Sequence, residues 1–390
     1  MKSIAAHFIV ASVVIFVAVA GHAQVFTPIA TVQNLVPVTG GPIVRDAEGN
    51  IYGASTWYRD GSCNPAPSCG FIYKLDPTGK VTVLLSFHGQ PDAAMPIPGM
   101  VLDNDGNIYG VTEYGGTYNF GTVFKLDSEG NETILHSFAG PPDDGELPFA
   151  GVIADSTGNL YGTTAYGGLQ IDRCSLGCGT VFKISAAGKE TVLYRFNGGT
   201  DGAWPWGASL LLSAGTLYGT TQVGGNTGGV CQSQSFIPGC GTVFKLDERG
   251  ETVLYRFNEG SDGAFPMAGV IRDAAGDLYG TAQTGGDLNC NPPFGCGVVY
   301  KLDPFGNETV LHAFEDQQDG QYPSAALAFD RGALYGSAGA IFYGGGIFQI
   351  NSSGTFKTLY QLQAGTSTMI HDTEGNLYGV YGDQVFRFAP

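Results

Sequence analysis

The fold is decided by a stretch near the middle of the chain: Leu160-Tyr-Gly-Thr-Thr164, followed after a loop by Gly179-Thr-Val-Phe-Lys-Ile184. An apolar run, Gly151-Val-Ile-Ala-Asp155, precedes this pair, and another, Glu190-Thr-Val-Leu-Tyr-Arg-Phe196, follows it. All four runs are short, rich in Val, Tyr, Phe and Thr, and bounded by Gly or Asp turns, which is typical of β-strands; none has the 3.6-residue period of a helix. Residues 149–196 therefore predict four consecutive antiparallel strands.

The Leu-Tyr-Gly triplet of this stretch recurs along the chain. Seven copies, spaced by 43 to 61 residues, are found at Ile51-Tyr52-Gly53, Ile108-Tyr109-Gly110, Leu160-Tyr161-Gly162, Leu217-Tyr218-Gly219, Leu278-Tyr279-Gly280, Leu334-Tyr335-Gly336 and Leu377-Tyr378-Gly379. Propeller blades have four strands and typically this period. We therefore predict an all-β, seven-bladed β-propeller with four antiparallel strands per blade. It is a single domain of residues 24–390, with repeats at about 41–87, 97–138, 149–196, 206–257, 267–314, 324–362, and 366–390 plus 30–36.

The two ends of the chain predict how the ring closes. After the last Tyr-Gly pair only one more strand follows, at residues 384–388, so the seventh repeat lacks its fourth strand. Residues 30–36, which precede the first repeat, resemble the fourth strands of other repeats. We expect this N-terminal strand to complete the last blade, because closure removes open sheet edges that would favour aggregation.

The first residues have the pattern of a secretory signal peptide. Lys2 gives a positive start, an apolar run covers residues 9–20, and small residues at Gly21 and Ala23 suit cleavage after position 23. The alternative is a membrane anchor, but the run is short for a span of about 20 residues. We expect a cleaved segment 1–23, a secreted or periplasmic protein, and no stable membrane insertion after cleavage.

Composition narrows the partners. The chain has a formal net charge of −17 and only 14% charged residues. An acidic surface repels phosphate backbones, so we expect no nucleic acid among its partners. Its 61 glycines follow no strict three-residue period, which excludes collagen. We expect a monomer, with a glycan or a surface protein as its partner.

The strand order sorts the loops onto two faces. Short turns of the pattern Asp-x-x-Gly, as at residues 155–158, lie on the turn face, where Asp opens the turn and Gly takes a positive φ. The second-to-third loops and the crossovers between blades lie on the opposite, long-loop face. This face carries all eight cysteines, as four pairs: Cys63 with Cys69, Cys174 with Cys178, Cys231 with Cys240, and Cys290 with Cys296. Neighbouring strands of a hairpin suit disulfides, whereas zinc would favour Cys-x₂-Cys and His partners, which are missing. We therefore predict four disulfides and no metal site.

The crossovers repeat an Asp-Gly-x-aromatic-Pro pattern. Its aspartates are Asp144, Asp201, Asp262 and Asp319, and its aromatics are Trp204, Phe265 and Tyr322; Leu147 stands at the aromatic position after Asp144. One interpretation is structural, with Asp and Gly forming a turn, Pro stiffening it and the aromatic filling a wedge between blades. The other is a ring of carboxylates and aromatics at the pore mouth that binds a ligand. Aromatics outside the repeat, namely Trp57, Tyr58 and Trp206, suit stacking on sugars or covering blade ends.

The repeat resembles a known family. Leu-Tyr-Gly-Thr-Thr, then Gly-Gly, then Gly-Thr-Val-Phe-Lys, as at residues 160–184 and 217–246, is similar to the GloVer (Gloeo–Verruco) repeat proteins of bacteria. The resemblance covers nearly the whole chain beyond the leader. It implies export and a β-propeller, and it supplies no catalytic residues.

A search for catalytic patterns gives no strong candidate. His136 and His312 stand where sibling fourth strands have Tyr194 and Tyr255, which indicates packing. The sequence contains neither Gly-x-Ser-x-Gly nor His-Glu-x-x-His, and we expect no cofactor. Three functions stay open: a non-catalytic binding or scaffold propeller for carbohydrate or protein, a glycoside hydrolase or lyase that uses pore-mouth carboxylates, and a purely structural envelope protein. The first is favoured because the crossover aspartates repeat with the blades, whereas a catalytic pair is made once.

Overall fold

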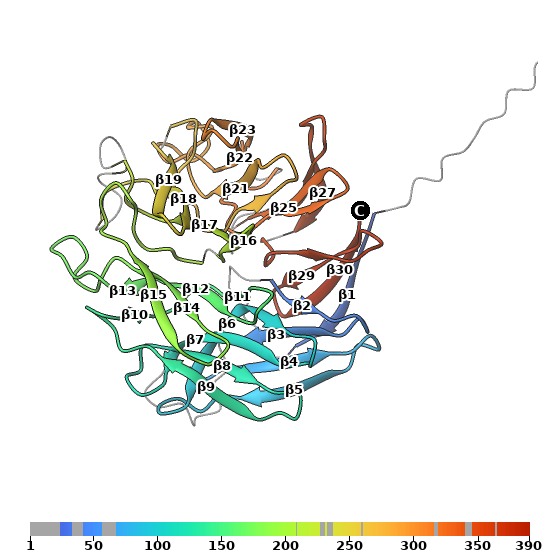
Figure 1. Cartoon of the computed structure of the whole chain (residues 1–390). Coiled ribbons are helices and arrows are strands. Elements are labelled where there is room, and N and C mark those ends of the chain that lie inside the picture. The colour runs from blue at the N-terminus through green and yellow to red at the C-terminus, as the bar shows by residue number, and fades with distance from the viewer. Residues whose placement is uncertain are drawn as a thin grey trace, which may run out of the picture.

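A computed structural model of the chain describes residues 24–32, 42–56, 68–207, 209–226, 231, 237–258, 260–315, 319–339, 345–362 and 365–390. These residues form seven four-stranded antiparallel sheets and contain no α-helix. The sheets surround a common centre, each with its first strand innermost and its fourth strand at the edge (Figure 1). The predicted all-β, seven-bladed propeller is therefore confirmed.

The strands follow the order of the chain within each blade. Blade 1 contains β2 (Val44–Arg45), β3 (Ile51–Ser55), β4 (Phe71–Leu75) and β5 (Val81–Ser86). Blade 2 contains β6 (Ala93–Leu102), β7 (Ile108–Gly115), β8 (Thr122–Leu126) and β9 (Glu132–Ser137). Blade 3 contains β11 (Ile153–Ala154), β12 (Leu160–Thr164), β14 (Thr180–Ile184) and β15 (Glu190–Arg195). Blade 4 contains β16 (Leu211–Ser213), β17 (Thr216–Thr221), β18 (Thr242–Asp247) and β19 (Gly250–Arg256). Blade 5 contains β20 (Ile271–Arg272), β21 (Leu278–Ala282), β22 (Val298–Leu302) and β23 (Glu308–Ala313). Blade 6 contains β24 (Ala328–Asp330), β25 (Ala333–Ala338), β26 (Gly345–Ile350) and β27 (Phe356–Leu362). A short ladder pairs β10 (Gly145–Glu146) with β13 (Tyr166–Gly167).

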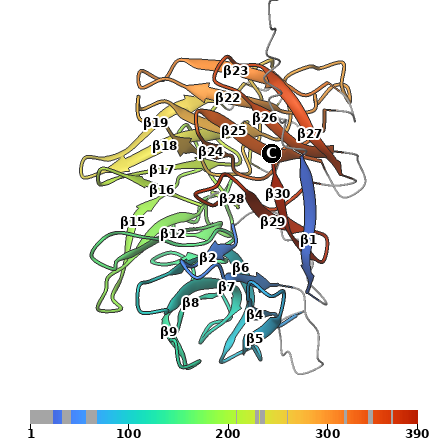
Figure 2. The ribbon, with the colours of Figure 1, turned by 90° about the vertical axis from the view of Figure 1, so that its right-hand side faces the viewer.

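The last blade joins the two ends of the chain. It contains β28 (Ile370–His371), β29 (Leu377–Tyr381), β30 (Gln384–Ala389) and β1 (Val25–Thr31). β1 lies antiparallel beside β30 (Figure 2), so the predicted closure of the ring by an N-terminal strand is confirmed.

The closing strand begins earlier than predicted: it runs from Val25 to Thr31 and shares residues 30 and 31 with the predicted segment 30–36, of which 33–36 lie outside the described residues. The ring of Phe26 decides the register, because it stacks on Phe386 and on Tyr360 with centroids 4.8 and 4.7 Å apart. Pro28 breaks the ladder locally, at a register shift, and a proline is tolerated there because β1 is an edge strand.

The Tyr-Gly motif has a packing cause. Gly162 lies opposite Phe182 across the β12–β14 pair, and a Cβ on Gly162 would be only 2.6 Å from Cζ of that ring. The same relationship holds in every blade, at 2.9 Å or less, for Gly53 and Tyr73, Gly110 and Phe124, Gly219 and Phe244, Gly280 and Tyr300, Gly336 and Phe348, and Gly379 and Phe386. These seven rings are fully buried. The glycine therefore makes room for a fully buried aromatic ring of its blade.

The tyrosine of the motif fixes the turn before it. The Tyr161 hydroxyl donates to Oδ2 of Asp155 at 3.0 Å, while Oδ1 of Asp155 accepts the backbone N–H of Asn159 at 3.0 Å. Gly158 has the positive φ, 81°, that the turn requires. The same Asp–Tyr bond occurs between Asp46 and Tyr52, Asp103 and Tyr109, Asp273 and Tyr279, and Asp372 and Tyr378.

Disulfides fasten the long loops. Cys174–Cys178, Cys231–Cys240 and Cys290–Cys296 have Cα–Cα distances of 5.3, 5.4 and 5.6 Å, which confirms these three predicted pairs. Cys69 is also disulfide-bonded, and Cys63 lies outside the described residues. Residues 1–23, with the predicted leader, lie outside them too. Within the described residues, no helix is long and apolar enough to span a bilayer.

Candidate functional site

The crossovers place a bulky residue in a strained backbone conformation on the long-loop face. In five crossovers the residue before the crossover proline has a φ between 52° and 58°: Met95, Leu147, Trp204, Phe265 and Tyr322. Such a left-handed conformation costs a non-glycine residue roughly 1–3 kcal/mol and persists only where its surroundings enforce it.

Backbone bonds between blades enforce this conformation. The N–H of Trp204 donates to the carbonyl of Cys178 in blade 3, and its own carbonyl accepts the N–H of Gln222 in blade 4, both at 2.9 Å. Leu147 bridges blades 2 and 3 in the same way, between the Phe120 carbonyl and the Ala165 N–H. Each crossover is therefore a rigid bridge between neighbouring blades.

The crossover aspartates serve their own blades. Asp201 Oδ2 accepts the Tyr194 hydroxyl and the Asn197 N–H, each at 2.9 Å. The corresponding bonds join Asp144 to His136 and Ala139, Asp262 to Tyr255 and Asn258, and Asp319 to His312 and Glu315. His136 and His312 thus replace a tyrosine and make the same bond. These hydrogen bonds hold the four carboxylates against their own outer strands, and ligand binding by them stays a prediction.

Two of the three tryptophans singled out from the sequence belong to one cluster, which we call the aromatic platform: Phe149, Tyr166, Trp204 and Trp206. The rings of Phe149 and Trp206 stack with centroids 4.1 Å apart. Tyr166 meets Trp204 edge-on at 5.7 Å and Trp206 at 6.1 Å. All four residues of the platform are half-buried.

The other predicted aromatics do not join this cluster through any ring contact described. Phe265 is buried, and the hydroxyl of Tyr322 accepts a hydrogen bond from Asn291. Trp57 and Tyr58 lie outside the described residues.

Two glutamates beside the platform were missed from the sequence. Burial raises the pKa of Glu113 to about 7, and burial also raises the pKa of Glu146. Glu146 faces Tyr166 across the β10–β13 ladder. The pKa of the Tyr166 hydroxyl is raised by burial and then by the charges of Glu146 and Glu113, so the three groups interact.

A departure from the repeat could have revealed both glutamates. Glu113 stands where blades 4 and 5 have Gln222 and Gln283, and Glu146 stands where the next crossovers have Ala203 and Ala264. A residue that occurs in only one of the repeats is a candidate for a site that the molecule forms only once.

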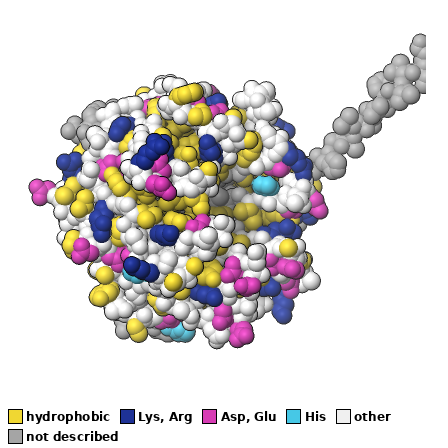
Figure 3. Space-filling model, in the orientation of Figure 1, with side chains coloured by type: hydrophobic (Ala, Val, Ile, Leu, Met, Phe, Trp, Pro, Cys, Tyr) yellow, Lys and Arg dark blue, Asp and Glu magenta, His cyan; other side chains and the backbone are white. Residues whose placement is uncertain are grey.

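The surface around the ring separates apolar from charged groups. Figure 3 shows hydrophobic side chains gathered around a hollow near the middle of one face, with acidic and basic side chains interspersed toward its edge.

Comparison with known proteins agrees with this architecture. The sequence profile described as the Gloeobacter/Verrucomicrobia repeat matches residues 38–237 and 232–385. The chain belongs to this repeat family. No curated protein sequence matches it.

Solved structures similar to this Gloeobacter/Verrucomicrobia repeat protein share its fold at low identity. A streptogramin B lyase matches with a TM-score of 0.59 and 13% identity, over 94% of this chain and 97% of the lyase. The extracellular domain of the B. thetaiotaomicron one-component system BT4673 matches with a TM-score of 0.55 and 10% identity, over 92% of this chain and 39% of that chain. At these identities the likeness shows the fold alone.

The repeat family accounts for the scaffold but not for the platform. The glycines, turn aspartates and crossover prolines recur from blade to blade, whereas Glu113 and Glu146 do not, and among the five crossover prolines only Pro148 and Pro205 are followed by an aromatic residue, Phe149 and Trp206. On the long-loop face, the platform and its two carboxyl groups are therefore the part that the repeat of this chain does not explain.

Proposed function

We propose that this protein is an exported, non-catalytic carbohydrate-binding propeller whose ligand lies on the aromatic platform. The observation that carries the proposal is a chain of four half-buried rings, in which successive rings contact each other with centroids 4.1 to 6.1 Å apart, next to two carboxyl groups. Sugar rings present C–H faces that stack on aromatic rings and hydroxyls that need a few well-placed polar partners. Glu113, Glu146 and the Tyr166 hydroxyl supply such partners.

Rigidity supports the proposal. The backbone of Trp204 is fixed by its two inter-blade hydrogen bonds, and Cys178, which accepts one of them, is bound to Cys174. A platform that is ordered before the ligand arrives loses less conformational entropy on binding.

Export is part of the proposal. Three disulfides in the described residues fit an oxidising compartment, and residues 1–23 have the pattern of a cleavable leader. We place the mature protein in the periplasm or outside the cell, where glycans of the envelope and of the surroundings are available as ligands.

A glycan array followed by calorimetry with the best oligosaccharide tests the function. Trp206→Ala should lower the affinity at least roughly tenfold, because stacking surface is lost. Phe305→Ala is the matched control, since Phe305 is 91% exposed in a turn of blade 5 and should leave the affinity unchanged. No glycan bound at all would favour a surface-protein ligand or the structural envelope role. If the Trp206→Ala variant binds the oligosaccharide as tightly as the parent protein, the aromatic platform is not the binding site.

A carbohydrate-active enzyme is the second candidate, and the Glu113 pKa of about 7 favours it. A carboxyl group that keeps its proton near neutral pH is suited to general-acid catalysis, with Glu146 as the second carboxylate. Release of reducing sugar or of unsaturated product from a polysaccharide panel, abolished by Glu113→Gln but retained in Asp262→Asn, would establish this candidate. Loss of activity only in Asp262→Asn would instead support the pore-mouth aspartates.

A further inference from the structure

A carboxyl pair recurs at the outer edge wherever blades 2 to 5 meet. A glutamate at or next to the start of a fourth strand approaches the crossover aspartate of the preceding blade: Glu190 with Asp144, Glu251 with Asp201, and Glu308 with Asp262. In each pair, burial first and the aspartate charge second raise the pKa of the glutamate. Two acidic groups at one partly buried place repel each other when both are ionised.

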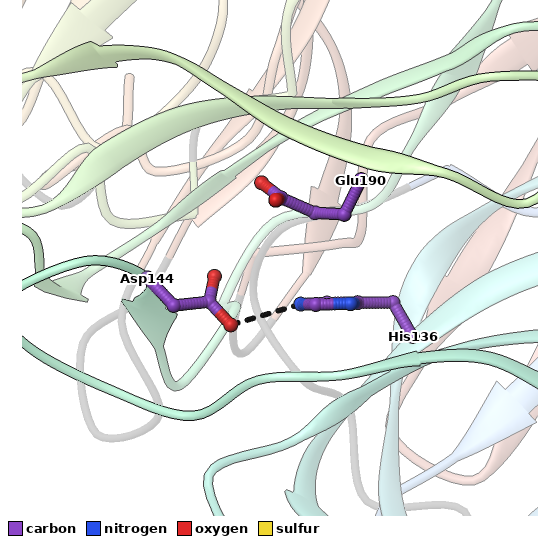
Figure 4. Close-up of side chains that lie close together, drawn as sticks. All are labelled: His136, Asp144 and Glu190. Carbon is purple, nitrogen blue, oxygen red and sulfur yellow. Dashed lines mark hydrogen bonds and ion pairs between the residues drawn. The ribbon is translucent and has the colours of Figure 1, made fainter.

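The third member of the cluster differs from blade to blade. Between blades 3 and 4 it is Tyr194, and between blades 4 and 5 it is Tyr255. Between blades 2 and 3 it is His136, whose Nε2 lies 2.9 Å from Asp144 Oδ2. One potential ligand atom from each of His136, Asp144 and Glu190 lies within 4.8 Å of the other two. Figure 4 shows the hydrogen bond between the aspartate and the imidazole, with the side chain of the glutamate above this pair.

The chain also contains this histidine without its glutamate. His312 lies 2.9 Å from Asp319, but Phe356 of blade 6 holds the place of the glutamate and stacks on the His312 ring with centroids 3.6 Å apart. His88 lies 3.5 Å from Asp92, whose charge acts on Glu132, between blades 1 and 2. Within the described residues, however, only His136, Asp144 and Glu190 bring an imidazole nitrogen and two carboxylate oxygens within 4.8 Å of one another.

The cluster between blades 2 and 3 has unused coordinating capacity. Oε1 of Glu190 is buried and has no hydrogen-bond partner among the described residues. Asp144 is held in place by the N–H groups of Ala139 and Gly145, at 2.8 and 2.6 Å. Arg195 is the nearby cation, and its Nη2 donates to the backbone carbonyl of Asp143. A cation between the three side chains would satisfy the open oxygen and offset the repulsion of the two carboxylates.

We propose that His136, Asp144 and Glu190 form a binding site for a divalent transition-metal cation of the zinc type. One imidazole nitrogen and two carboxylate oxygens are a donor set that Zn²⁺ accepts at about 2.0–2.2 Å, with water in the fourth position. Ligand atoms of a tetrahedral zinc site lie about 3.3–3.5 Å apart, so the His136–Asp144 pair needs to open by only a few tenths of an ångström. The cation takes the place of the proton between Nε2 and Oδ2, and the imidazole proton resides on Nδ1. Because the ligands come from two blades, the metal fastens blade 2 to blade 3.

Calorimetric titration of ZnCl₂ into the full protein, stripped with EDTA and carrying no histidine tag, tests the site. We expect one Zn²⁺ per chain and a rise in Tm with zinc, because the folded state alone holds the three ligands together. His136→Tyr should weaken binding at least roughly a hundredfold, and it should fold because Tyr194 and Tyr255 occupy the same place in the sibling blades. Glu190→Gln, which keeps the size of the side chain, provides a second test that is independent of the histidine.

The control is His312→Tyr, which removes a His–Asp pair beside which the described residues place a phenylalanine ring where blade 3 has Glu190. It should leave the zinc stoichiometry and affinity unchanged. No saturable zinc binding by the parent protein overturns the site, and so does binding that both His136→Tyr and Glu190→Gln leave intact. Because none of these variants touches the aromatic platform, the outcome is independent of the carbohydrate proposal.

Discussion

Pro205 packs against Gly179 so closely that a Cβ on Gly179 would lie 2.7 Å from Cδ of the proline. Gly179 precedes the third strand of blade 3, and Pro205 belongs to the crossover into blade 4. The same contact, at 2.4 to 2.7 Å, joins Gly70 to Pro96, Gly121 to Pro148, Gly241 to Pro266 and Gly297 to Pro323. In these five blades, the glycine that follows the long loop thus packs directly against the proline of the next crossover.

Gly179→Ala should destabilise the protein by about 3 kcal/mol or more, because the new methyl group both meets Pro205 and is forced to a φ of 98°. Gly188→Ala is the matched control. Gly188 also has a positive φ, 79°, but nothing lies within 4 Å of its added Cβ, so only the backbone cost of about 1 kcal/mol remains. Chemical denaturation of both variants measures the difference; equal losses would show that the proline contact contributes nothing.

Tyr194→Phe should cost about 1–2 kcal/mol, because the buried Asp201 loses a donor while its Oδ1 already has no hydrogen-bond partner. Tyr360→Phe tests the same position in blade 6, where residues 363–369 contain no aspartate to receive the hydroxyl, and it should change stability by less than about 0.5 kcal/mol. Urea unfolding of the two variants side by side decides the matter. A loss at Tyr360 as large as that at Tyr194 would contradict the assignment of the Tyr194 hydroxyl to Asp201.

Features that are local to one repeat could be predicted from the sequence. The Tyr-Gly triplet, the Asp-x-x-Gly turns and the cysteine pairs each act within one blade, so seven copies identified the fold and its strand order. The start of the closing strand was misplaced because its position depends on a contact with another part of the chain: Phe26 must reach Phe386 and Tyr360, and nothing in residues 24–36 alone shows this.

The candidate sites lie between blades, so their residues are far apart in the sequence and were harder to predict from it. Glu190 meets His136 only because the outer strand of blade 3 begins where that of blade 2 ends. The crossover aspartates attracted attention because they repeat, yet their repetition reflects a shared turn. Glu113 and Glu146 are the opposite case, since comparing each blade with its siblings would have exposed them.

The raised and lowered carboxyl pKa values predict how stability changes with pH. Hydrogen bonds from Asn131 lower the pKa of Asp127 below 3.8, so its contribution is present above that pH and is lost as the pH falls through the lowered value. Burial, then Asp201, raises the pKa of Glu251 to about 7, so its contribution is complete below 4.5 and is lost as the pH rises through about 7. Glu308 behaves like Glu251. Scanning calorimetry should therefore find the highest Tm at about pH 4–5 and a decline toward pH 8.

Glu251→Gln isolates one of these groups, because glutamine imitates the protonated acid and does not ionise. The Tm of this variant should decline less than that of the parent between pH 5 and pH 8. Glu248→Gln, an exposed turn residue nearby, should decline like the parent. Parallel pH profiles for parent and Glu251→Gln would mean that Glu251 does not titrate in this range.

Removal of the Cys174–Cys178 disulfide should leave the fold intact. Blade 2 has no cysteine, yet the Phe120 carbonyl accepts the Leu147 N–H at 2.9 Å, the same distance as between the Cys178 carbonyl and the Trp204 N–H. The inter-blade bridge therefore forms without a disulfide. The two cysteines are only four positions apart, so the chain-entropy argument predicts a loss of about 2 kcal/mol for the double change Cys174→Ser and Cys178→Ser. Denaturant unfolding under non-reducing conditions measures this loss, and circular dichroism shows whether the strands remain. An unfolded double variant would contradict the prediction, because it would mean that blade 3 depends on a bond that blade 2 does without.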